Sequence, residues 1–220
     1  MDQEFDKYAA DYDEHMQELL GDHKYYTYQK VSTLRQNGLL KSGMRILDYG
    51  CGTGTLASEI VRSGLGATVD GFDPSEDSLK RVADDVRAQG AFTTDGTQLG
   101  RDYDLVVFSN VMHHVEPTER DAVLADARSR LAPTGHIAII EHNPLNPMTR
   151  KIVRDCPFDE NAILLPSGEA KDRLSRLFGG PANVRFTLFF PASLKSLMGL
   201  EKFLGWCPLG AQYLAFAGQR

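Results

Sequence analysis

Three glycines at every second position have the spacing of a ligand-binding turn, and an acidic residue, Asp48, precedes them. They are Gly50, Gly52 and Gly54. Alternate glycines let the backbone turn tightly and let a ligand approach it without meeting a Cβ atom. A helix expected from Thr55 would point its unpaired N–H groups and the positive end of its dipole at the same place. This pattern predicts a cofactor site at the end of a buried strand.

The residues around the glycines distinguish this turn from two other kinds of cofactor site. A dinucleotide fingerprint, G-x-G-x-x-G/A, requires a small residue at the position of Thr55, and a carboxylate at Asp48 would repel a diphosphate. A P-loop requires a Lys-Ser/Thr pair, which this stretch lacks. A cationic ligand suits Asp48 better. A nicotinamide-dependent reductase and a glycine turn without a ligand are the weaker alternatives.

Histidines follow two apolar stretches that read as buried parallel strands, at 104–109 and 136–140. In a doubly wound sheet these would be the neighbouring fourth and fifth strands, whose carboxyl ends open into one crevice. A histidine there can act as a general base, because its unperturbed pKa lies near neutrality. We take His114 and His142 as candidate catalytic bases and expect His113 to pack or to bond to backbone. The side chains expected to converge are His113, His114, Glu141, His142 and Asn143.

The pattern Asp48-x-Gly50-x-Gly52-x-Gly54 resembles motif I of the class I methyltransferases that use S-adenosylmethionine. That cofactor carries an ammonium and a sulfonium and no phosphate. The stretches 5–13 and 110–114 are similar to the small-molecule branch of this family, which includes enzymes of ubiquinone and menaquinone biosynthesis. The Asn/Asp-Pro-Pro-aromatic signature of DNA amine methyltransferases and the carboxylate cluster of magnesium-dependent catechol-type enzymes are absent. The alternative is a catalytically silent relative that binds a partner protein.

The resemblance implies transfer of a methyl group to an O, N or C atom of a small acceptor, and it implies a set of cofactor contacts. Asp73 ends the expected second strand, where a carboxylate can accept both ribose hydroxyls. Its alternative role is to cap the next helix, although Ser75 is a better cap. Asp95 faces the adenine or caps Thr97. The implied cofactor-binding residues are Tyr8, Tyr12, Asp48, Gly50, Cys51, Gly52, Gly54, Asp73, Pro74, Asp95, Gly96 and Asn110.

Composition narrows the possible partners and location. The 220 residues have a net charge of −6, which argues against nucleic acid as a partner. Three separated cysteines suggest no disulfide framework and no metal site, and hence a reduced, cytoplasmic compartment. We see no signal peptide and no apolar run long enough to span a bilayer. The oligomeric state stays open.

The elements that must position these residues form one α/β domain. We expect a helical lid at 1–40, a cofactor-binding core at 41–141 and an acceptor-side cap at 142–220. In the lid, Tyr8 and Tyr12 either cover the cofactor's sulfonium or pack in the hydrophobic core. The resemblance implies a doubly wound, mostly parallel, seven-stranded Rossmann-like sheet, in the order 3-2-1-4-5-7-6 and with helices on both faces. Further expected helices are 25–38, 76–89, 117–131 and 193–204; the other strands are 44–47, 67–73, 91–94, 184–190 and 212–218.

The tail departs from the minimal fold, because helical patterns are inserted after the fifth and sixth strands. Two Asn-Pro pairs at 143–147 predict a loop that is not helical. Helix 193–204 has an apolar stripe, and aromatic residues lie on both sides of it. The simpler interpretation is that it caps the edge of the sheet. We expect instead that it contacts an acceptor with a substantial apolar part, and that it makes weak contact with a membrane surface.

Overall fold

Seven strands form one sheet in the computed structural model of the chain, which describes residues 23–219. They are β1 (Arg45–Tyr49), β2 (Thr68–Phe72), β3 (Phe92–Thr93), β4 (Tyr103–Ser109), β5 (Leu131–His142), β6 (Asn183–Thr187) and β7 (Gln212–Gly218). The order across the sheet is β3-β2-β1-β4-β5-β7-β6, as expected. Strands β1 to β5 pair in parallel, and β7 pairs antiparallel with both β5 and β6.

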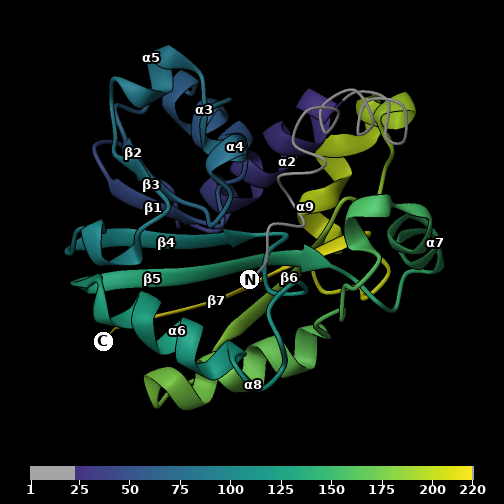
Figure 1. Cartoon of the computed structure of the whole chain (residues 1–220). Coiled ribbons are helices and arrows are strands. Elements are labelled where there is room, and N and C mark those ends of the chain that lie inside the picture. Colours follow the sequence, from purple (N-terminus) through teal and green to yellow (C-terminus); the bar gives the residue numbers. More distant parts are fainter. Residues whose placement is uncertain (1–22, 220) are drawn as a thin grey trace.

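Helices cover both faces of the sheet (Figure 1). The α-helices are α2 (His23–Gln36), α3 (Thr55–Arg62), α4 (Glu76–Leu79), α5 (Asp84–Arg87), α6 (Arg120–Ser129), α7 (Pro147–Asp155), α8 (Ser167–Phe178) and α9 (Glu201–Leu204); the 3-10 helices are η1 (Gly96–Gln98), η2 (Pro157–Asp159) and η3 (Ala192–Leu200). Strand β4 shows how the two faces are filled. Leu105 and Val107 pack with α2 and α3, whereas Val106 and Phe108 pack with α6 and α8. A strand buried on both faces is therefore apolar throughout.

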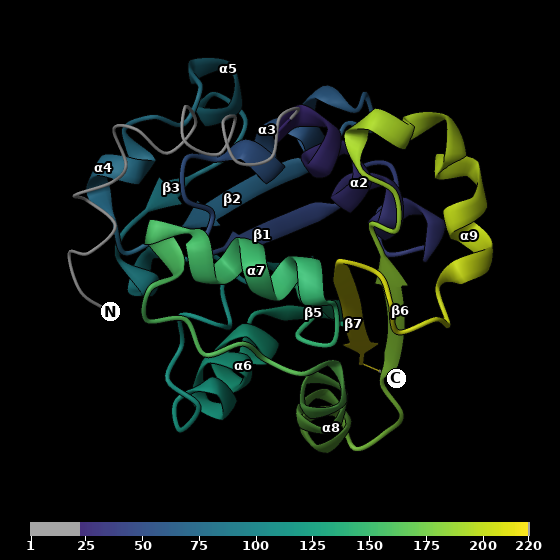
Figure 2. The ribbon, with the colours of Figure 1, turned by 90° about the vertical axis from the view of Figure 1, so that its right-hand side faces the viewer.

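Helix α7 lies at the edge of the sheet where β4 and β5 end (Figures 1 and 2). Its start is capped by Asn146, whose side chain accepts hydrogen bonds from the amides of Met148 at 2.9 Å and Thr149 at 3.1 Å. The prediction of a loop at the Asn-Pro pairs is thus right only up to Asn146. Pro147 begins the helix, since proline is tolerated in the first turn.

Two expected helices have different boundaries. The helix expected at 76–89 is broken into α4 and α5, and the Arg87 guanidinium donates to the carbonyls of Leu79 and Val82 at the break. The helix expected at 117–131 ends at Ser129, and β5 begins already at Leu131. The strand is thus longer than the expected 136–140, and a shift in register between β4 and β5 accommodates Pro133 within it.

The segment expected as helix 193–204 is also irregular. It forms η3, with a non-helical φ of −113° at Leu194, followed by the single turn α9. Most of its large apolar side chains are exposed, so little apolar packing within residues 23–219 supports a regular helix there. Among the described residues, no helix combines the length and the apolarity that a membrane span requires.

Candidate active site

The glycine loop at the carboxyl end of β1 depends on backbone conformations that favour glycine. Gly50 has φ +80°, and a Cβ atom there would lie 2.6 Å from Val111 Cγ2. Gly52 has φ +51°, but a Cβ atom there would meet nothing within 4 Å. Gly50 is therefore required by packing. Gly52 presents its backbone to open space, as the expected cofactor seat requires.

Asp73, at the end of β2, holds this loop in place. Its carboxylate accepts a hydrogen bond from the Gly52 amide at 2.7 Å through Oδ2 and from the Ser75 amide at 2.9 Å through Oδ1. Ser75 is the residue that caps α4. A carboxylate oxygen can accept a second hydrogen bond. The prediction that Asp73 binds a ribose is compatible with these contacts and stays a prediction.

A cavity of about 570 Å³ joins the glycine loop to the ends of β4, β5 and β7, a size typical of small-molecule sites. Asp95 and Gly96 do not line it: the exposed Asp95 carboxylate accepts hydrogen bonds from Thr97, which is the capping alternative. Gly54 does not line the cavity either, and Tyr8 and Tyr12 lie outside the described residues. The predicted residues that line the cavity are Asp48, Gly50, Cys51, Gly52, Asp73, Pro74, Asn110, His114 and His142.

Asp48 is a buried carboxylate at the cofactor end of the cavity. Within the described chain, neither oxygen has a hydrogen-bond partner at standard geometry, although the Ala57 amide exerts a small lowering effect on the pKa. Burial raises the pKa of Asp48 to about 7; the Lys30 charge opposes this rise and the Asp73 charge adds to it. A buried carboxylate without partners is costly unless a ligand compensates it. An ammonium group would do so, and the loop residues therefore fit S-adenosylmethionine.

Lys30 of α2 is a cavity residue that sequence reasoning missed. Its ammonium donates to Ser109 Oγ at 2.9 Å, where β4 ends. Burial lowers the pKa of Lys30 to about 8, although the charges of Glu141 and Asp48 counteract this effect. A single lysine in an amphipathic helix gives no signal in the sequence. Only the packing of α2 against α3 brings it to the cavity.

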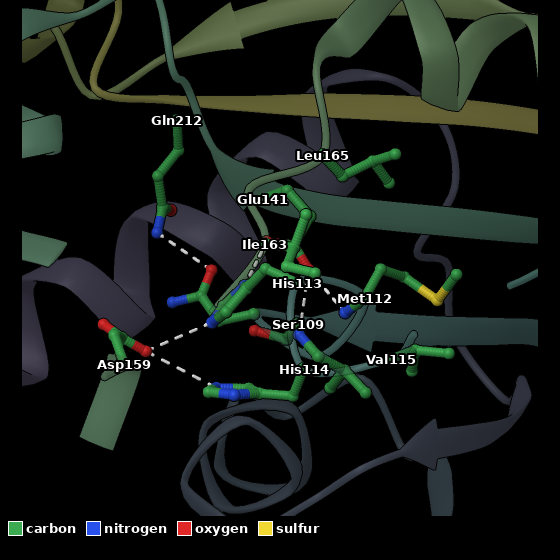
Figure 3. Close-up of polar contacts among 12 residues, drawn as sticks. Ser109, Met112, His113, His114, Val115, Glu141, Asp159, Ile163, Leu165 and Gln212 are labelled. Carbon is green, nitrogen blue, oxygen red and sulfur yellow. Dashed lines mark hydrogen bonds and ion pairs between the residues drawn. The ribbon is translucent and has the colours of Figure 1, made fainter. Parts of the chain in front are cut away.

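Histidines from the loop after β4 meet acidic groups at the other end of the cavity (Figure 3). His113 Nδ1 lies 2.6 Å from Glu141 Oε2, and Glu141 Oε1 accepts from the amides of Val111 at 2.9 Å and Met112 at 2.7 Å. His113 therefore bonds to a carboxylate and not to backbone, which corrects our expectation. Asp159 Oδ1 lies 3.3 Å from His113 Nε2 and 3.4 Å from His114 Nε2.

The pKa values in this cluster indicate that one imidazole is charged at pH 7 and two are neutral. Burial by itself would lower the pKa of His113, but the charge of Glu141 and hydrogen bonds with Asp159 and Glu141 raise it to about 9. Burial would raise the pKa of Glu141, but His113 lowers it to about 2. Burial and the His113 charge lower the pKa values of His114 and His142 to about 4. Both of these rings are neutral at pH 7 and can accept a hydrogen bond from a ligand.

The predicted convergence of the fourth and fifth strands is confirmed for His113, His114, Glu141 and His142. Asn143 does not join them, because its amide donates to the carbonyls of Pro208 and Gly210.

Two amides complete the acceptor end of the cavity. Gln212, the first residue of β7, donates from Nε2 to Asn110 Oδ1 at 3.1 Å. Its own Oε1 is buried without a hydrogen-bond partner among residues 23–219. Asn110 has a φ of +58°, which is uncommon for a residue other than glycine and typical of functional sites. A ligand with a hydrogen-bond donor would satisfy Gln212.

The apolar wall of the cavity comes from residues just before η3. Leu188, Phe189 and Phe190 line it, together with Met148 and Ile152 of α7. Segment 193–204 and Trp206, which we expected to contact the acceptor together with Phe189 and Phe190, do not line the cavity. Their large side chains face solvent instead; Phe203 is 65% and Trp206 74% exposed.

Comparisons with known proteins link the sequence to one group of enzymes. A sequence model described as a methyltransferase domain matches residues 12–198. A ubiquinone biosynthesis O-methyltransferase from Rhizobium johnstonii is 36% identical over 84 residues, which cover 35% of this chain and 33% of that protein. The match therefore spans one third of the relative's own length.

Solved structures share the fold at low sequence identity. A SAM-dependent methyltransferase from Archaeoglobus fulgidus has a TM-score of 0.68 and 17% identity, with 94% of this chain and 99% of that chain covered. The magnesium protoporphyrin IX methyltransferase from Synechocystis PCC 6803, solved with bound S-adenosylhomocysteine, has a TM-score of 0.64 and 19% identity, with 98% and 97% covered. At these identities the likeness shows the fold alone.

Proposed function

The chain belongs to the methyltransferase-domain family, and from this premise we propose that it transfers a methyl group from S-adenosylmethionine to an oxygen of a small, partly apolar acceptor. One observation carries the proposal. A single cavity contains the buried Asp48 carboxylate at one end and the neutral His114 and His142 at the other.

The glycine loop supports the cofactor half of this proposal. Asp48 would bind the ammonium group, the carboxylate of Asp73 would bind the ribose, and the open backbone face at Gly52 would admit the cofactor. S-adenosylmethionine supplies a methyl group on a sulfonium: the acceptor oxygen bonds to the methyl carbon while the carbon–sulfur electron pair stays on sulfur. The protein's part is to align the two reactants and to exclude water.

The far end of the cavity supports the acceptor half. Phe189 and Phe190 offer apolar surface, and the orphan Gln212 Oε1 can accept a hydrogen bond from an acceptor hydroxyl. His114 or His142 would take the hydroxyl proton as that oxygen is methylated. The choice of oxygen also rests on the stretch of sequence shared with the O-methyltransferase from Rhizobium.

The test has two measurements. Calorimetry with S-adenosylhomocysteine reports cofactor binding, and isotope-labelled methyl donor reports transfer to a panel of apolar phenols, matched anilines and a metabolite extract. We expect cofactor binding and label in methyl ethers of the phenols. Label only in anilines would refute the choice of oxygen, and binding of NADH in place of S-adenosylhomocysteine would refute the methyltransferase. Cofactor binding without transfer to any acceptor would indicate the silent, partner-binding alternative.

A further inference from the structure

Three side chains at the acceptor end of the cavity have the spacing of ligands around one metal ion. One donor atom from each of His113, His114 and Asp159 lies within 4.8 Å of the other two. Asp159 Oδ1 lies 3.3 Å from one histidine Nε2 and 3.4 Å from the other. Nitrogen and oxygen ligands at the usual zinc distance of about 2.0–2.1 Å stand about 3.3 Å apart in a tetrahedral site. The two measured separations match that value.

The contact between His113 and Asp159 is long for a charge-assisted hydrogen bond. A charge-assisted N–H···O bond is typically about 2.7–2.9 Å long. The contact from His113 Nδ1 to Glu141 is short, at 2.6 Å, whereas the contact from its Nε2 to Asp159 is long, at 3.3 Å. The ring is therefore held tightly on one side. On its other side, the distance from Nε2 to the Asp159 carboxylate is the one expected when a metal ion binds both atoms.

Glu141 has the position of an outer-shell partner for such a site. It accepts hydrogen bonds from two backbone amides, those of Val111 and Met112, which fix its carboxylate. When His113 donates from Nδ1 to Glu141 and an ion displaces the proton on Nε2, the Nε2 lone pair is directed toward Asp159. A carboxylate that orients a histidine ligand in this way is the usual support of a protein metal site.

The three side chains are mostly buried, and they leave a coordination position open, as a reactive metal centre requires. The side chains are 1%, 18% and 11% exposed for His113, His114 and Asp159, and all three line the cavity. Three protein ligands leave at least one position for a further ligand. Imidazole and carboxylate together favour divalent transition metals over the hard ions Mg²⁺ and Ca²⁺.

We propose that His113, His114 and Asp159 bind one divalent transition-metal ion, represented by Zn²⁺, with an open position that faces the acceptor. If the proposed function holds, on which this second step rests, the acceptor is a hydroxyl compound that binds the ion through oxygen. In that arrangement His114 is a ligand, so the neutral His142 takes the hydroxyl proton, and the metal-bound oxygen is the atom that takes the methyl group. The ion would then activate the acceptor without any change in its own oxidation state.

Cobalt titration tests the metal site directly, because the visible spectrum of Co²⁺ reports four- or five-coordination. The full chain is first stripped with a chelator, then titrated with Co²⁺ and competed with Zn²⁺. We expect one ion per chain in the wild type and in two control variants. Asp155→Asn changes an exposed carboxylate on α7, and His136→Gln changes a histidine in the middle of β5 that does not line the cavity.

The variants Asp159→Asn and His114→Gln should bind Co²⁺ at least about 10–100-fold more weakly, the loss usual for even an outer-shell partner. Equal affinity in all five proteins, or a spectrum that stays that of the hydrated ion, would overturn the proposal. His113 would then be an imidazolium shared between Glu141 and Asp159. Calorimetry with S-adenosylhomocysteine on the same samples keeps the two proposals separate. Normal cofactor binding without cobalt binding refutes the metal site alone, whereas absent cofactor binding refutes the proposed function.

Discussion

The Gly52 amide donates a 2.7 Å hydrogen bond to the carboxylate of Asp73, which joins the glycine loop after β1 to the end of β2. One carboxylate thus both shapes the loop and faces the cavity that the loop borders. We expect Asp73→Ala to weaken S-adenosylhomocysteine binding by about 1.5–3 kcal/mol, the usual value of a hydrogen bond to a charged group. Calorimetry measures this. Asp77→Ala, at an exposed position on α4, is the control, and an unchanged dissociation constant in Asp73→Ala would contradict the assignment.

Asp48 should make cofactor binding depend on pH. Burial raises its pKa to about 7, so its carboxylate is charged above that pH and protonated below it. An ammonium group is attracted only to the charged form, and affinity should therefore fall as pH is lowered from 8 to 6, by up to about tenfold per pH unit below the pKa. Calorimetry at three pH values checks this. Asp48→Asn should bind weakly at all of them, and a wild type with no pH dependence would refute the ammonium contact.

The same carboxylate should destabilise the protein when no cofactor is bound. Because the pKa of Asp48 in the folded state is higher than in the unfolded state, the folded state holds its proton over a wider range of pH. The stability of the ligand-free protein should then decrease as pH rises from about 4 through 7. We expect Asp48→Asn to raise the melting temperature at pH 8 and to have little effect at pH 4. A lower melting temperature for the variant at pH 8 would contradict this.

Gly50 and Gly52 should respond differently to added side chains. Gly50→Ala places a Cβ atom 2.6 Å from Val111 Cγ2 and should lower stability by about 1–3 kcal/mol. The double variant with Val111→Ala should recover part of this loss, which urea denaturation would measure. Gly52→Val meets no such neighbour, although a β-branched residue is strained at φ +51°; it should lose some stability, stay folded and lose S-adenosylhomocysteine binding. Wild-type affinity in folded Gly52→Val would place the cofactor elsewhere.

Arg120 should stabilise the loop that carries the histidines. Its buried guanidinium donates to the carbonyls of Val115 at 3.1 Å and Ile163 at 2.5 Å, and the Ile163 amide in turn donates to the His113 carbonyl at 2.8 Å. Arg120→Met leaves these carbonyls unpaired and should cost about 2–5 kcal/mol of unfolding free energy. Arg154→Met, on the exposed side of α7, should change stability by less than about 0.5 kcal/mol. A similar small change in both variants would mean that Arg120 is dispensable.

The sequence predicted those parts of the fold that depend on local patterns. The apolar run at 104–109 marks β4 because a strand buried on both faces must be apolar, and the glycine spacing marks the loop because left-handed turns favour glycine. The break between α4 and α5 was not predictable in this way. At the break Arg87 donates back to the carbonyls of Leu79 and Val82, a contact that no helical pattern reveals.

The candidate site was predicted in part for a similar reason. His113, His114, Glu141 and His142 follow strands that the pattern identified, so their convergence follows from strand order. Lys30, Asp159 and Gln212 reach the cavity only through the packing of α2, η2 and β7. Segment 193–204 misled the prediction because an apolar stripe normally marks a buried face, and here its side chains are exposed.

The position of β7 between β5 and β6 has a consequence for how the molecule is made (Figure 1). Among the described strands, β5 gains its second neighbour, and β6 its single neighbour, when residues 212–218 are in place. During synthesis β1 to β4 can pair early. The half of the sheet at the acceptor end cannot form until β7 is translated, seventy residues after the end of β5. Until then β5 has an exposed apolar edge, which favours aggregation. Nascent chains stalled before residue 212 should thus have the glycine loop formed but need chaperone protection at β5.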